Sequence, residues 1–151
     1  MPRLTTFATL RTCADLLGKA KHDLGRMTSS MGDEYAAFDF FVTTEHLVDW
    51  YLPNDKHAQR ALREGEPLLQ VVSHIANGVK HFRATAPQHT SVADVHRKHC
   101  ADEGYVETGY WGDVLTVELS PNEAALLGFQ SIEAYQLALR VFAYWREKLG
   151  V

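Results

Sequence analysis

The pattern of hydrophobic positions predicts four long helices. Apolar residues recur at steps of three and four over residues 4–27, 34–52, 67–82 and 131–150, and this spacing places them along one side of a helix. The second of these segments is apolar almost all round, which is typical of a central helix that other elements cover on several sides. Because the connections between the segments are short, the pattern favours an up-and-down helical bundle.

Local signals indicate where helices begin and end. Asp33 can cap the second helix, and Pro53 ends it because a proline disfavours the helical conformation of the preceding residue. Residues 54–64 predict a short charged helix. Residues 120–128 open with Ser-Pro-Asn-Glu, a capping signal with proline at the first helical position, and end at a glycine, so they predict a second short helix.

One stretch of the chain has β character. Apolar and polar residues alternate near the end of residues 105–119, and a Gly-Asp pair in this stretch can form a tight turn. We therefore expect a small β-hairpin there. Before it, Ser91 and Asp94 have the spacing of a capping box, which predicts a helix from Ser91 to about residue 103.

The expected fold class is mainly α. We expect one domain over residues 1–151, an up-and-down helical bundle of about four main helices with a small β-hairpin insertion before the C-terminal helices. A chain of 151 residues is long enough to bury a core. Its 46% apolar and 23% charged residues exclude a wholly disordered chain.

Charge and targeting signals narrow the functional classes. The net charge of −4 gives no general attraction to nucleic acid or to an anionic membrane. No apolar run reaches the roughly 20 residues of a membrane helix, and the first residues lack the pattern of a signal peptide. The two cysteines, Cys13 and Cys100, form neither a disulfide framework nor a zinc motif. We expect a soluble cytoplasmic protein with no membrane partner and no cofactor.

The second helix carries a narrow polar stripe within its apolar surface. Asp39, Thr43 and His46 fall within about 60° of one another around the helix axis, and Asp49 follows His46 by three residues. Polar groups on so apolar a helix need partners when they are buried. We therefore interpret Asp39, Thr43, His46 and Asp49 as a buried polar set and a candidate site.

The third long helix carries a second polar stripe. Gln70, His74, Asn77 and His81 are spaced by four, three and four residues, and Lys80 lies beside them. An ordinary solvated face is usually rich in lysine and glutamate, whereas this one consists of amides and imidazoles. We expect these five residues to form a surface that binds a partner protein or a second copy of the chain. Two other interpretations stay open: an ordinary polar outer face, and an interior network in which the two stripes meet.

A metal or acid–base site is an alternative use of the same side chains. Glu45, His46 and Asp49 of the second helix, with His74 and His81 of the third, are suitable ligand types on facing helices. However, His74 and His81 lie two helical turns apart, about 10.5 Å, which is too far for both to bind one ion directly. The HExxH pairing of metalloproteases is absent as well. We therefore assign no metal ligand.

Local basic residues leave nucleic acid as a less favoured partner. Residues 80–83 and 96–99 are rich in histidine, lysine and arginine, and such groups can support RNA cleavage through acid–base chemistry and phosphate binding. Clusters of this kind are more often solvated helix ends. The sequence also contains no P-loop and no GxGxxG motif.

Two motifs resemble a known group of proteins. Residues 40–50 read FFVTTEHLVDW and residues 75–82 read IANGVKHF, and the last helix carries a Tyr-Trp pair. Together they resemble a family of small bacterial and phage-borne hypothetical proteins, over about residues 35–149. The architecture is also similar to HEPN-type helical domains, many of which are ribonucleases or their inactive relatives in toxin–antitoxin and phage-defence systems.

The HEPN ribonuclease motif is an arginine and a histidine on one helix with four to six residues between them. In this motif a polar residue usually follows the arginine. Arg83 and His89 have the required spacing, but the residue after the arginine is Ala84, and Pro87 interrupts the helix between them. A HEPN-like ribonuclease, or a metal-assisted hydrolase that uses the bundle histidines, is therefore the alternative function. The function that we expect first is association with a partner protein or with itself, in a defence or toxin–antitoxin-like setting.

Overall fold

The computed structural model of the chain describes residues 7–81, 90–98 and 113–151, and for residues 79–81 it describes the backbone only. In chain order the elements are α1 Cys13–Ser29, α2 Glu34–Tyr51, α3 Lys56–Gly65, α4 Pro67–His81, β1 Val92–Lys98, β2 Val114–Leu119, α5 Pro121–Leu127, β3 Ser131–Glu133 and α6 Ala134–Leu149. The four long helices that the hydrophobic pattern predicts correspond to α1, α2, α4 and α6. The predicted fold class, mainly α with a small β insertion, is confirmed.

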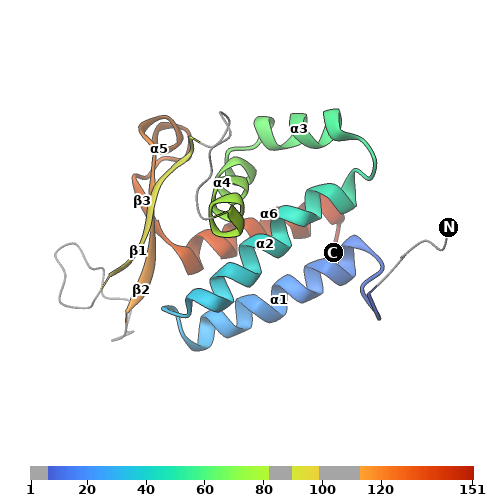
Figure 1. The fold of residues 1–151 in the computed structure, drawn as a ribbon, viewed down its shortest axis with the longest axis horizontal. Coiled ribbons are helices and arrows are strands. Elements are labelled where there is room, and N and C mark those ends of the chain that lie inside the picture. The colour runs from blue at the N-terminus through green and yellow to red at the C-terminus, as the bar shows by residue number, and fades with distance from the viewer. Residues whose placement is uncertain (1–6, 82–89, 99–112) are drawn as a thin grey trace.

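The helices are arranged around α2. Figure 1 shows α1 and α2 side by side along the long dimension of the molecule, α6 behind them, and α4 nearly end-on. α2 packs against α1, α4 and α6, while α3 lies across the end of α4 and returns toward α2. Neighbours therefore lie on several sides of α2 and cover much of its apolar surface, as the sequence predicts. The aromatic side chains of Tyr35, Phe38, Trp50 and Tyr51 remain exposed.

The hydrophobic core extends from α2 to the helices around it. Phe40 and Leu47 of α2, Val72 of α4 and Trp145 of α6 are all fully buried. Burying a large apolar side chain stabilises the fold by about 1.5–3 kcal/mol. The core reaches the sheet through Val117 of β2, which is also fully buried. Helices and strands therefore share one core.

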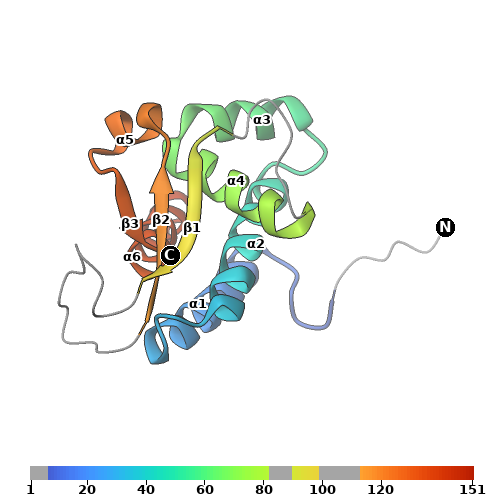
Figure 2. The same ribbon diagram turned by 60° about the vertical axis from the view of Figure 1, so that its left-hand side comes forward.

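The β insertion is a three-stranded antiparallel sheet with the order β1-β2-β3. Val117 of the central strand pairs with Val95 on one side and with Ile132 on the other. Figure 2 shows the sheet standing at one end of the helices, with β1 on the side nearest α4. The central strand is almost entirely buried, so its backbone polar groups need partners on both edges.

The predicted helix from Ser91 to about residue 103 is wrong where the structure describes this stretch, because residues 92–98 form β1. The carboxylate of Asp94 accepts a hydrogen bond from the backbone N–H of Val95 and caps no helix. Tertiary structure overrides the local helix signals here, because β1 supplies the backbone hydrogen-bond partners for one edge of the buried β2. Of the predicted hairpin, the second arm is β2, while residues 105–112 lie outside the described residues.

Two helix starts also differ from the prediction. α1 begins at Cys13, where Thr12 and Asp15 form a reciprocal capping box that the periodicity alone does not indicate. α6 begins at Ala134, because residues 131–133 pair with β2 before the helix starts. The predicted capping box at Ser120 is also wrong, since its side chain makes no capping hydrogen bond, although Pro121 does open α5.

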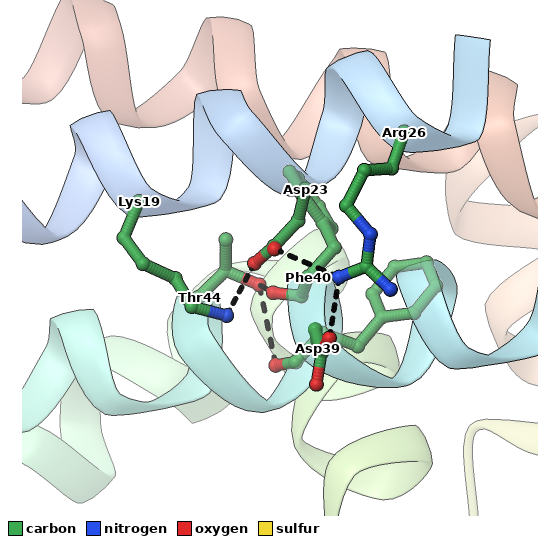
Figure 3. Close-up of polar contacts among 7 residues, drawn as sticks. Lys19, Asp23, Arg26, Asp39, Phe40 and Thr44 are labelled. Carbon is green, nitrogen blue, oxygen red and sulfur yellow. Dashed lines mark hydrogen bonds and ion pairs between the residues drawn. The ribbon is translucent and has the colours of Figure 1, made fainter. Parts of the chain in front are cut away.

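A charged cluster ties α1 to α2 on the face drawn in Figure 3. The Asp23 side chain is only 1% exposed, and Lys19 and Arg26 of the same helix pair with its carboxylate. Arg26 also pairs with Asp39 of α2, and Thr44 nearby donates its hydroxyl hydrogen to the Phe40 carbonyl. The buried carboxylate is compensated within α1, and Arg26 extends the compensation across to α2.

Replacement of Asp23 by Asn should destabilise the fold by about 1–3 kcal/mol, because a buried partner of two cations is lost. The Asp39 side chain is 39% exposed, so replacement of Asp39 by Asn should cost less than about 1 kcal/mol. Urea unfolding of the two variants at neutral pH measures the difference. Equal losses would contradict the central role of Asp23 in the cluster.

The turn between α1 and α2 approaches the start of β2 closely. A Cβ atom at Gly32 would lie 2.7 Å from the backbone oxygen of Asp113. Arg97 of β1 lies beside the same contact, with its guanidinium 3.5 Å from Glu34 and 3.9 Å from Asp113. The sheet is therefore held against the N-terminus of α2 at a point that only glycine can occupy without displacement.

Replacement of Gly32 by Ala should destabilise the protein by about 1–3 kcal/mol, since backbone atoms must shift to admit the methyl group. Gly25 of α1 is the matched control, because a Cβ there would have no neighbour within 4 Å. Gly25→Ala should stabilise the helix by about 0.5–1 kcal/mol. Thermal unfolding of both variants checks the opposite signs, and two shifts of the same sign would exclude this close contact.

Candidate functional site

A polar cleft of about 620 Å³ lies between α2, α3 and α4. This volume is in the range of small-molecule sites, about 300–1,000 Å³. The cleft is lined almost entirely by charged, amide and hydroxyl side chains from the three helices, together with one residue that precedes β1. They are Glu45, His46, Asp49, Lys56, Gln59, Arg60, Arg63, Glu64, Gln70, Ser73, Asn77 and Thr90.

Two side-chain amides hold the helices that form the cleft. The buried Gln59 of α3 donates to the backbone carbonyl of Leu52 at 2.8 Å, which binds α3 to the end of α2. Gln70 of α4 donates to the carbonyl of Glu64 at 2.7 Å and so satisfies the C-terminal end of α3. The short helix is thus fixed at both ends, and its charged side is directed into the angle between α2 and α4.

Glu45 and Arg63 form the floor of the cleft. Glu45 is 8% exposed, and its Oε1 lies 2.9 Å from Nε of Arg63. The Nη2 group of the same guanidinium lies 3.3 Å from Asp49 Oδ1 and 3.3 Å from the backbone carbonyl of Glu45. Asp49 Oδ2 is in turn 3.6 Å from His46 Nδ1. Two carboxyl groups therefore share one guanidinium.

Burial dominates the electrostatics of the floor. It raises the pKa of the Glu45 carboxyl to about 7, and this effect outweighs the Arg63 guanidinium and the Ser73 hydroxyl, which both lower the pKa. The charge of Asp49 raises it further. Although the Ser73 hydroxyl is near, Glu45 Oε2 is buried and receives no hydrogen bond of good geometry from the described residues.

The α4 side of the cleft contains part of the predicted partner surface. Gln70 and Asn77 line the cleft, whereas His74 faces a second cavity of about 820 Å³ next to β1. The backbone N–H of Val92 donates to Nδ1 of His74 at 3.0 Å, so the start of β1 lies on this histidine. The predicted stripe is thus divided between two cavities. The side chains of the remaining members, Lys80 and His81, lie outside the described residues.

The polar set predicted on α2 is divided as well. Thr43 is buried as expected, but the side chain of His46 is 44% exposed and lines the cleft with Asp49. Asp39 pairs with Arg26 of α1 at the edge of the helix pair. The Asp49 side chain is 36% exposed, so the interpretation of Asp39, His46 and Asp49 as buried residues is wrong. Spacing around a helix reports only which residues share a face, and the neighbours of α2 change along its length.

The described part of the chain contains neither a metal-binding cluster nor a membrane-spanning helix. Among the described residues, no group of three or more histidine, cysteine, aspartate or glutamate side chains is arranged to hold a metal ion. His46 and His74 line different cavities, so they do not belong to one site. Within residues 7–81, 90–98 and 113–151, no helix combines the length and the apolar character needed to cross a membrane.

Arg63 is the functional candidate that sequence reasoning misses. It lies 18 residues after Glu45, so no helical spacing connects the two side chains. The available signal is indirect: a glutamate within a helix as apolar as α2 needs a compensating cation when it is buried. The basic residues of the following short helix are the nearest ones along the chain, but only the fold selects Arg63 from among them.

The raised pKa of Glu45 makes a prediction about stability. Between pH 4.5, its ordinary pKa, and pH 7 the folded protein retains a proton that the unfolded chain releases. The free energy of unfolding should therefore decrease as the pH rises through this window, by roughly 3 kcal/mol in total. Urea unfolding at intervals across the window should show this decrease in the wild type and not in Glu45→Gln.

Replacement of the exposed Glu147 of α6 by Gln provides the control, which should keep the wild-type pH dependence. If wild type and Glu45→Gln gave parallel stability curves, Glu45 would titrate alike in the folded and unfolded chains. The burial of its charge would then have to be compensated by Arg63 and Ser73.

Comparison with known proteins finds no relative of this chain. No model of a protein family matches the chain, and no curated protein and no solved structure matches it. The cleft and the residues that form it are therefore the basis for a functional proposal.

Proposed function

We propose that the protein acts by binding, and that the cleft between α2, α3 and α4 holds a polar segment of a partner protein or of a second copy of the chain. The observation that carries this proposal is the floor of the cleft. Glu45, a residue that is only 8% exposed, lines the cleft, and one of its carboxyl oxygens has no hydrogen-bond partner among the described residues. Such an atom is costly to leave unpaired, and a bound group can supply the missing partner.

The shape and chemistry of the cleft support binding of an inserted group. Its lining is polar, and each wall is held by a hydrogen bond between elements, so the hollow exists before a partner arrives. Gln70 and Asn77, two residues of the predicted partner surface, line this cleft. The proposed binding site is therefore a cavity, where the sequence predicted one face of a helix. A defined cavity selects partners by the group that enters it.

The proposed setting rests on the similarity in architecture to HEPN-type helical domains. A cytoplasmic protein of a defence or toxin–antitoxin-like system would act on a partner in this way. Arg83 and His89, which have the HEPN-like spacing, lie outside the described residues, so the structure does not test this part of the proposal.

Acid–base catalysis is the second candidate, and one observation favours it. A carboxyl group with a pKa of about 7 in an accessible cleft is suited to accept or donate a proton at neutral pH. Arg63 beside it could stabilise a developing negative charge. A hydrolase or ribonuclease of this kind would depend on Glu45, so any activity that persists in Glu45→Gln excludes it.

Photo-crosslinking from the cleft tests the binding proposal. A benzoylphenylalanine in place of Arg60, a cleft residue whose side chain is 76% exposed, should form a discrete covalent product in cells that normally contain the protein. The same group in place of Lys21, exposed on α1 and outside the cleft, should form none. A product of twice the chain mass would identify self-association, and any other mass a different partner.

A blocking variant makes the test specific. Lys56→Trp, at an exposed residue that lines the cleft, should obstruct the cleft and abolish the product from position 60 while the circular dichroism spectrum stays that of the wild type. Identical products from positions 60 and 21, or a product that persists in Lys56→Trp, would contradict binding in the cleft.

A further inference from the structure

The charge balance at the floor of the cleft indicates what the inserted group is. Glu45 and Asp49 lie one turn apart on α2, and the single guanidinium of Arg63 contacts both. Asp49 also lies 3.6 Å from the His46 imidazole. Two carboxyl groups facing one permanent cation leave one negative charge to compensate when both are ionised. The floor is therefore suited to one more positive charge.

The hydrogen-bonding atoms around the floor point in the same direction. Glu45 Oε2 lacks a donor among the described residues. Gln70 and Asn77 each donate one side-chain N–H to a backbone carbonyl, of Glu64 and Ser73 respectively, which leaves their amide oxygens as acceptors. The floor and the α4 wall thus offer several acceptors, next to the Arg63 guanidinium, whose Nε also has no hydrogen-bond partner among the described residues.

The other cations of the cleft do not remove this deficit. Arg60 is engaged at the rim, where its Nε lies 2.7 Å from Glu64 Oε1 on the same helix. Lys56 is an exposed residue at the first position of α3, and no described ion pair connects it to Glu45 or Asp49. Both lie toward solvent, where charges are screened, while the floor carboxyl lies in the interior.

From this arrangement we propose that the floor of the cleft binds the cationic tip of a partner's basic side chain, with its N–H groups donating to the carboxylates of Glu45 and Asp49. This inference rests on the proposed binding function and names the group that enters. A guanidinium or ammonium group supplies both the missing charge and the missing donors, as charge-assisted hydrogen bonds require. A metal ion is not suited to the position, because the described residues provide no sufficient set of ligands.

Binding of this kind is coupled to a proton. The cation stabilises the ionised form of Glu45, so binding releases the proton that burial otherwise retains. The titratable and charged groups that line the cleft with Glu45 are His46 and Asp49 on its own helix and four residues of α3, Lys56, Arg60, Arg63 and Glu64. The described α4 residues of the cleft, such as Ser73, are neutral. Low pH should therefore weaken binding.

The test uses the intact protein and a pair of blocked tripeptides, acetyl-Gly-Arg-Gly-amide and its citrulline counterpart. Citrulline has nearly the shape of arginine but carries no charge. The arginine peptide should shift the side-chain amide NMR signals of Gln70 and Asn77, and its affinity should be about tenfold higher at pH 8 than at pH 6, since a pKa of about 7 makes the carboxylate population about tenfold larger. The citrulline peptide should bind much more weakly at both values.

Two variants identify the titrating group. Glu45→Gln should lose both the preference for arginine and the pH dependence, with its fold verified by circular dichroism and by an unchanged backbone NMR spectrum. His46→Gln should keep the pH dependence, which separates Glu45 from the neighbouring imidazole. Loss of the dependence in His46→Gln, with its retention in Glu45→Gln, would overturn the inference.

Further probes separate the sources of the cation. Tighter binding of the arginine peptide than of methylguanidinium supports a partner side chain, and the reverse order would replace the partner by a free small cation. Equal binding of the citrulline peptide, preference for methyl phosphate, or no shift with any probe would overturn the cation inference. If the photo-crosslinked product still formed at position 60 in that case, the proposed binding function would stand with a different inserted group.

Discussion

Burial of α2 is the constraint on which the rest of the structure depends. The helix is apolar around most of its circumference, so it is stable only when α1, α4 and α6 remove that surface from water. The positions of these three helices follow from this requirement. The sheet is held at the N-terminal end of α2, where Gly32 and Arg97 fix the contact. Each major contact between helices is thus either with α2 or with a helix that covers it.

A single buried carboxyl group on this helix explains why the cleft has its particular chemistry. Glu45 cannot be removed from water without compensation, and the compensation comes from α3, which folds back to bring Arg63 beside it. That compensation is partial, because Arg63 is shared with Asp49 and one oxygen of Glu45 has no donor among the described residues. A fully satisfied ion pair would have no hydrogen-bonding atom left for a ligand, whereas the floor of this cleft can still bind one more charged group.

The start of β1 decides how the polar residues of α4 are used. Because Val92 hydrogen-bonds to His74, the strand passes over the polar stripe and separates it into two parts. Gln70 and Asn77 face a polar cleft, and His74 faces a cavity with many apolar and aromatic residues. Side chains that share one helix face therefore take part in different environments, and no enzyme built on His46 and His74 together agrees with this geometry.

Periodicity and capping signals in the sequence determined the class of fold, the four long helices and the central place of α2, because these depend on residues within a few positions of one another. Asp33 at the start of α2 and the glycine after α5 are examples. Only the tertiary structure decided that residues 92–98 form a strand, since the partner that requires it, β2, lies further along the chain. It likewise decided that Arg63 meets Glu45 and that His46 lies at an opening. These outcomes depend on which surfaces meet in space, and the sequence pattern of one element carries no information about its neighbour.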